Sequence, residues 1–137
     1  PLWDICGKHL LDKLQKFQNR AARIIAGLSY ETNSADVLES LGWETLESRR
    51  QRMKSVFLYK IINDYTAPNL KQSLMGSNSM PSSYILRSTD TDIAFPKPRT
   101  EFLKKSFKYS GAKLWNSLSR EAKEAQSISI FKQNIGR

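Results

Sequence analysis

The sequence predicts a mainly α-helical fold with one small β hairpin (α+β), with about three N-terminal helices before the hairpin and short helices after it. Three observations predict this fold. Apolar residues recur at helical spacing over residues 10–28, short alternating stretches flank a polar turn at residues 88–91, and residues 76–83 contain few apolar side chains. The 137 residues have the length of a single domain.

The first helix is predicted over residues 10–28, with Gly27 ending it in a left-handed cap. Its apolar residues follow one another at spacings of four and three: Leu10, Leu14, Phe17, Ala21, Ile24 and Leu28. We expect this apolar stripe to be buried. Four basic residues fall together on a neighbouring face, which we expect to be exposed: Lys13, Lys16, Arg20 and Arg23.

Two further helices are predicted before the loop. One covers residues 35–41, with Asn33 or Ser34 as its N-cap and Gly42 as its stop. The other covers residues 45–63 and carries its own apolar stripe: Leu46, Met53, Phe57 and Ile61. One more helical turn is predicted at residues 69–75.

The second half of the chain has a different pattern. Tyr84 and Leu86 alternate with polar residues, as do Ile93 and Phe95, which predicts the hairpin. Residues 96–99 contain two prolines and should be extended, whereas residues 102–109 fit either helix or strand. Short helices follow at residues 111–118, with Trp115 and Leu118 facing inward, and at 128–135. We therefore expect a helical half (1–75), a flexible loop (76–83) and a mixed half (84–137), packed together as one domain.

The formal net charge of +9 favours a polyanionic partner, chiefly RNA or DNA, with an anionic membrane surface as the lesser option. The charge is unevenly placed. Residues 31–48 hold five acids and no Lys or Arg, and residues 49–60 hold five basic residues and no acid. The acidic stretch can offset part of the basic charge by pairing inside the molecule.

The residues that catalysis requires are scarce. His9 is the only histidine, and Asp90 and Asp92 form the only close carboxylate pair, in a Ser- and Thr-rich stretch typical of a polar turn. Cys6 and His9 have a ligand-like spacing but no second pair, so we expect no metal and no cofactor. A lone cysteine also excludes an internal disulfide and favours an intracellular, reducing compartment. We expect neither catalysis in this segment nor a membrane-spanning helix.

Four stretches carry a resemblance to a known family. They are residues 11–25 (LDKLQKFQNRAARII), Leu41-Gly42-Trp43 with Leu46 and Arg49-Arg50, Tyr84 with residues 86–88, and residues 106–107 through Gly111 to 114–118 (LWNSL). In this order they resemble the C-terminal region after the polymerase domain in reverse transcriptases of jockey-type non-LTR retrotransposons and related long interspersed elements. The resemblance covers most of the chain.

The resemblance implies that the chain is a segment of a longer protein with an endonuclease domain, a reverse transcriptase domain and this tail. The parent would nick target DNA in the nucleus and copy element RNA from the nick, with the cytoplasm as a further location. None of the family's catalytic carboxylates lies in these residues, so the resemblance assigns no catalytic role here.

Two interpretations of function stay open. In the first, this is a non-catalytic accessory domain that grips template RNA or target DNA through its phosphates. The expected contacts are Lys13, Lys16, Arg20, Arg23, Arg49, Arg52, Lys54, Lys97, Arg99, Lys104, Lys105 and Lys108. Phe107 and Tyr109 can stack on bases, with ordinary core packing as the alternative. For the basic residues of the first helix, the alternative is a solvated helix face.

In the second interpretation the chain is a structural domain that docks on the polymerase domain of its parent without touching nucleic acid. Membrane-surface binding is disfavoured, because the basic helices carry few bulky residues beyond the stripes that the core requires. The sequence does not predict the oligomeric state.

Overall fold

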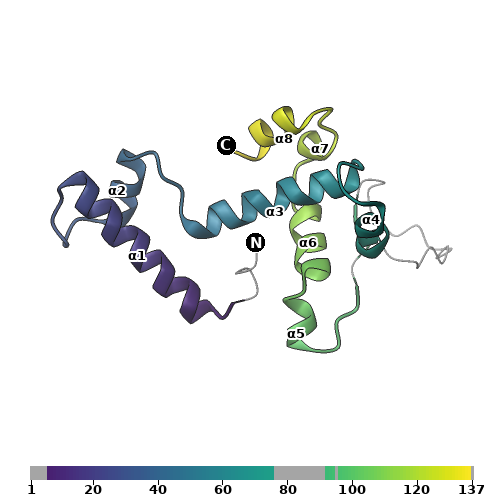
Figure 1. Cartoon of the computed structure of the whole chain (residues 1–137), viewed down its shortest axis with the longest axis horizontal. Helices are drawn as coiled ribbons and strands as arrows, with labels where there is room; N and C mark the ends of the chain where they lie inside the picture. Colours follow the sequence, from purple (N-terminus) through teal and green to yellow (C-terminus); the bar gives the residue numbers. More distant parts are fainter. Residues whose placement is uncertain (1–5, 76–91, 95, 137) are drawn as a thin grey trace. The chain divides into compact units, whose positions relative to one another are not determined.

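The computed structural model describes residues 6–75, 92–94 and 96–136. Of the described residues 68% are helical and none is in a strand. Their helices, shown in Figure 1, are α1 (Lys8–Ala26), α2 (Ser34–Ser40), α3 (Leu46–Ile62), α4 (Pro68–Met75), α5 (Glu101–Lys104), α6 (Phe107–Asn116), α7 (Arg120–Lys123) and α8 (Ile128–Ile135). The helices predicted at residues 10–28, 35–41, 45–63 and 128–135 are therefore confirmed, as is the predicted turn at 69–75.

The predicted α+β class is wrong, because the described residues form helices and no strand. Much of the predicted hairpin, residues 84–91 and Phe95, lies outside the described residues. At Ile93, the main-chain N–H donates to Oδ1 of Asn116 (2.9 Å), and the carbonyl accepts from Nδ2 of Asn116 (3.0 Å). One amide side chain thus satisfies both main-chain groups that a neighbouring strand would have bonded.

The chain divides into two compact units, Pro1–Gln51 and Arg52–Arg137, and α3 runs through the division. Each unit has its own cluster of buried apolar residues. The loop predicted at residues 76–83 lies outside the described residues, so the division expected there stays a prediction.

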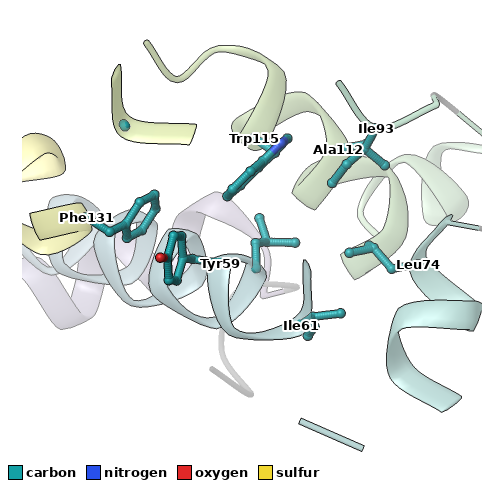
Figure 2. Close-up of a cluster of buried hydrophobic side chains, with 9 residues drawn as sticks. Tyr59, Ile61, Leu74, Ile93, Ala112, Trp115 and Phe131 are labelled. Carbon is teal, nitrogen blue, oxygen red and sulfur yellow. The ribbon is translucent and has the colours of Figure 1, made fainter. Parts of the chain in front are cut away.

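The core of the second unit is aromatic at its centre. It consists of Leu58, Tyr59, Ile61, Leu74, Ile93, Ala112, Trp115, Ala122 and Phe131. Figure 2 shows three of its rings side by side. The Tyr59 ring stacks on Phe131 with 4.5 Å between centroids, and Trp115 lies 6.1 Å from Phe131. The inward position predicted for Trp115 is confirmed, and Leu118 packs against the same cluster.

The buried face of α3 differs from the predicted stripe. Ile61 is buried as expected, but Met53 and Phe57 are exposed, and Leu58 and Tyr59 are buried instead. For Leu58 the reason lies on α6, where Gly111 leaves room for its side chain. A Cβ atom at Gly111 would lie 3.2 Å from Cδ2 of Leu58, so the missing side chain allows α3 to present Leu58 there.

The first unit has a much smaller core, formed by Ala22, Val37 and Leu38, with Ala26 and Leu41 packed against it. The prediction that the apolar stripe of α1 is buried is wrong. Phe17 is 69% exposed and Ile24 is 71% exposed, and Leu10 and Leu28 are exposed too. The small residues Ala22 and Ala26 face α2 in their place.

The Tyr59 hydroxyl gives the second unit a testable pH dependence. It donates to the carbonyl of Ala125 (2.6 Å), and burial raises the pKa of Tyr59, with a smaller contribution from Tyr65. Because the folded state holds this proton more tightly than the unfolded chain, Tyr59 contributes full stability below the ordinary tyrosine pKa of about 10. That contribution falls as pH rises through about 10 toward the raised folded value.

We expect Tyr59→Phe to lower the free energy of unfolding by about 1 kcal/mol near neutral pH, because the hydrogen bond is lost. The deficit should shrink as pH rises above about 10, because only the wild-type chain must lose the Tyr59 proton. Urea unfolding followed by tryptophan fluorescence measures both effects. Tyr30→Phe, at an exposed tyrosine, is the control. A deficit of constant size across this pH range would contradict the assignment.

Candidate nucleic-acid interface

Helix α1 has three faces of different chemistry, each about a third of its circumference at 3.6 residues per turn. The inner face holds Leu11, Gln15, Gln18, Ala22 and Ala26, which are buried or half-buried. The second face is the apolar stripe already described. The third face is basic and holds Lys13, Lys16, Arg20 and Arg23. The rotation of α1 about its own axis therefore decides which chemistry is exposed.

Two glutamines set that rotation. Oε1 of Gln15 accepts from the main-chain N–H of Leu46 (2.9 Å), and Nε2 of Gln18 donates to the carbonyl of Glu44 (3.0 Å). Nε2 of Gln15 donates to Oε1 of Gln18 and to Oδ1 of Asn19, both at 2.8 Å, which fixes the orientation of the amides. We call the two bonds to Glu44 and Leu46 the glutamine clamp. One of them satisfies an N–H in the first turn of α3, which has no partner within that helix.

The chain after α1 folds back on the helix. Gly27 adopts φ 64°, a left-handed conformation that costs glycine little, and the N–H of Leu28 donates to the carbonyl of Arg23 (2.9 Å). The left-handed cap predicted at Gly27 is confirmed. A turn then closes through the bond from the N–H of Thr32 to the carbonyl of Ser29 (3.2 Å). Tyr30 lies inside this turn.

Arg23 fastens the turn to the helix. Its Nε donates to the carbonyl of Thr32 (2.9 Å), and its guanidinium carbon lies 5.3 Å from the centroid of the Tyr30 ring. This is the geometry of a cation–π contact. Arginine carries five N–H donors, and the bond to Thr32 uses one of them.

These elements form a hollow in the surface of the first unit, which we call the basic hollow. Its lining residues are Lys13, Lys16, Phe17, Asn19, Arg20, Arg23 and Tyr30. All four basic residues predicted on the first helix line it. Lys13, Lys16 and Arg20 are exposed, and Arg23 is half-buried. The structure thus brings together four cations and two aromatic rings.

The basic residues predicted on α3 have different surroundings. Arg49 is exposed in the first unit, and Arg52 is half-buried in the second. Lys54 is only 5% exposed, donates from Nζ to Oγ of Ser110 (2.7 Å), and lies 5.9 Å from the Phe107 ring centroid. Its position inside the second unit gives phosphate little access, so we leave it out of the proposed interface.

The remaining predicted contacts belong to the second unit and lie around α5. Lys97, Arg99, Lys104 and Lys105 are exposed, and Lys108 is half-buried. Lys104 is engaged with Glu101, and the hydrogen bond to that carboxylate raises the pKa of Lys104.

Of the two interpretations given for Phe107 and Tyr109, stacking on bases or core packing, core packing is confirmed for Phe107. Phe107 packs edge-on against Phe57, with 5.6 Å between centroids, and lies against the core, while Tyr109 is half-buried. Phe17 and Tyr30 are the exposed rings beside the cations. The sequence pattern predicts a core position for Phe17 and no role for Tyr30. The available signal was the position of Phe17 between Lys13 and Arg20 on the helix surface.

Among the described residues, no group of three or more His, Cys, Asp or Glu is placed to hold a metal ion. Asp92 is bonded to Nζ of Lys123 (2.8 Å), and Asp90 lies outside the described residues. No helix in the described ranges has the length and apolar character needed to cross a membrane.

No protein-family model, curated protein or solved structure matches the chain. The resemblance to retrotransposon reverse transcriptases therefore stays a prediction from the sequence.

The glutamine clamp should matter for the stability of the first unit. We expect Gln15→Ala with Gln18→Ala to cost about 1–2 kcal/mol, because the main-chain groups of Glu44 and Leu46 lose partly buried partners. Hydrogen exchange of the α1 and α2 amides measures the loss. Gln51→Ala is the control, because its side-chain bond to Glu47 is exposed and long, at 3.5 Å. Equal protection in the double variant and the control would argue against the clamp.

Proposed function

We propose that the chain is a non-catalytic accessory domain that binds RNA or DNA through phosphate contacts made by α1. The observation that supports this proposal best is the gathering of Lys13, Lys16, Arg20 and Arg23 around one hollow. Cations placed this closely release condensed counterions when they meet a nucleic-acid backbone, and this gives affinity without base specificity.

The balance of charge on α1 supports the same function. The helix carries five basic residues, Lys8, Lys13, Lys16, Arg20 and Arg23, against one acid, Asp12. Arg49 and the basic residues around α5 are further contacts in the proposal: Lys97, Arg99, Lys104, Lys105 and Lys108. Arg52 is a weaker candidate, because its side chain is half-buried and already engaged.

The resemblance gives this binding a place in a larger protein. We propose that the chain is the C-terminal part of a non-LTR retrotransposon reverse transcriptase. There it would hold template RNA or target DNA while the endonuclease and polymerase domains carry out the chemistry. RNA and DNA share the phosphates that α1 would contact, so phosphate binding alone does not distinguish them.

The exposed apolar stripe of α1 favours a second candidate, docking on the polymerase domain of the parent. Leu10, Phe17, Ile24 and Leu28 are exposed on one helix face. A face of this kind is typical of a protein–protein contact. Under this alternative the isolated chain should self-associate and bind no nucleic acid, which sedimentation with and without an oligonucleotide measures.

The proposal predicts a specific loss on charge removal. Replacing Lys13, Lys16, Arg20 and Arg23 by Gln should weaken binding of a generic oligonucleotide by at least about tenfold at about 0.1 M salt. It should also reduce the slope of log affinity against log salt by about three, because about four phosphate contacts are lost. Fluorescence anisotropy across a salt series measures both quantities, and circular dichroism checks that helix content is kept.

The control removes the same charge elsewhere, by replacing Lys60, Lys113, Arg120 and Lys132 with Gln. These residues lie in the second unit, outside the proposed contacts. The proposal expects the control to bind nearly as the wild type does. If both variants lose the same binding affinity, net charge explains the loss and the α1 contacts do not. If the wild type does not bind at low salt, the proposal is wrong.

A further inference from the structure

We propose that the basic hollow selects single-stranded nucleic acid, with Phe17 and Tyr30 as platforms on which unpaired bases stack. This inference rests on the proposed function, because it names the class of nucleic acid taken at the same site. It adds a preference for single-stranded over double-stranded nucleic acid, which phosphate contacts alone do not provide.

Tyr30 has the placement of a stacking platform. Its side chain is 81% exposed, although the turn that carries it is anchored at both ends. The main chain is closed between Ser29 and Thr32, and Arg23 binds the Thr32 carbonyl while its guanidinium lies over the Tyr30 ring. A ring restrained in this way loses little conformational entropy on binding a base, and an aromatic face accepts any of the bases.

Phe17 supplies a second ring in the same hollow. It lies one helical turn from Lys13 and from Arg20, at the edge of the apolar stripe that borders the basic face. At 69% exposed, it contributes little to the core of the first unit. An exposed ring between two phosphate-binding side chains matches the combination that single-strand-binding proteins use, a positive groove that follows the backbone and aromatic rings that take the bases.

The same chemistry disfavours a duplex. In a duplex the base faces are covered by neighbouring bases, and only the phosphates and the base edges reach a protein surface. The cations of the hollow can contact either form, but Phe17 and Tyr30 can stack only on bases that are already unstacked. Single strands therefore gain contacts that duplexes lack.

An anionic membrane surface is the competing ligand, since exposed apolar residues flank the cations. The arrangement of the hollow favours nucleic acid. Tyr30 and Phe17 line one hollow together with four cations, so aromatic rings and phosphate-binding groups can act on one strand. The exposed apolar stripe of α1 beside the basic face is the feature that a lipid-binding helix would share. The experiment includes this competitor.

The test compares binding of the whole chain to a single-stranded oligonucleotide, to a duplex of the same length and to anionic phosphatidylserine vesicles. Two variants, Phe17→Leu and Tyr30→Leu, keep apolar bulk but remove the aromatic ring. Tyr30→Phe keeps the ring, and Tyr65→Leu removes an exposed ring from the second unit. A 2-aminopurine base in the single strand reports stacking directly through quenching of its fluorescence.

We expect each Leu variant in the hollow to lose about tenfold in single-strand affinity, to lose quenching, and to bind duplex within about twofold of the wild type. Tyr65→Leu should bind as the wild type does, and Tyr30→Phe should regain the quenching that Tyr30→Leu loses, because it keeps the ring. If the wild type binds the single strand and the duplex equally well, and binding still depends on the α1 cations, the inference is overturned and the proposed function stands. Binding to vesicles alone, or to none of the three ligands, would overturn both.

Discussion

The glutamine clamp is the interaction on which the surface of the first unit depends. Helix α1 offers an apolar face, a basic face and a face of amides and small residues, and burial of the apolar face would be the usual outcome. Gln15 and Gln18 instead bond the main chain at Leu46 and Glu44, while Ala22 allows close approach of α2. Main-chain groups left unpaired inside a protein are costly, so these bonds hold the rotation of the helix. The basic and apolar faces are exposed as a consequence.

The second unit follows more familiar rules. Its core gathers large side chains around the stacked rings of Tyr59 and Phe131, and Gly111 on α6 leaves room for Leu58 of α3. A side chain satisfies polar main-chain groups there, because Asn116 bonds both the N–H and the carbonyl of Ile93. The two units thus differ in how they bury their helices. The second unit relies on a large apolar core, whereas the first relies on side-chain amide hydrogen bonds around a small core.

Sequence patterns predicted where most helices lie, because periodicity, caps and glycine stops are local signals. They did not predict which face of α1 is buried, since hydrophobic periodicity assumes that the most apolar face packs inward. The amides that overturned this assumption bond residues about thirty positions away. The hairpin prediction was wrong for a related reason. The main-chain groups of Ile93 bond the side chain of Asn116 on α6 and no neighbouring strand. For the site, helix geometry grouped the four α1 cations correctly. Tyr30 was missed because its position depends on a turn and on Arg23.

We propose that α1 presents its basic and aromatic residues outward and binds nucleic acid there. The most direct measurement is an NMR titration of the isotope-labelled chain with a short single-stranded oligonucleotide. We expect shifts concentrated at Lys13, Phe17, Arg20 and Arg23 and in the turn at Tyr30, with little change at the side-chain amides of Gln15 and Gln18. Shifts confined to the second unit, or large shifts at the two glutamine amides with none at Phe17 and Tyr30, would contradict it.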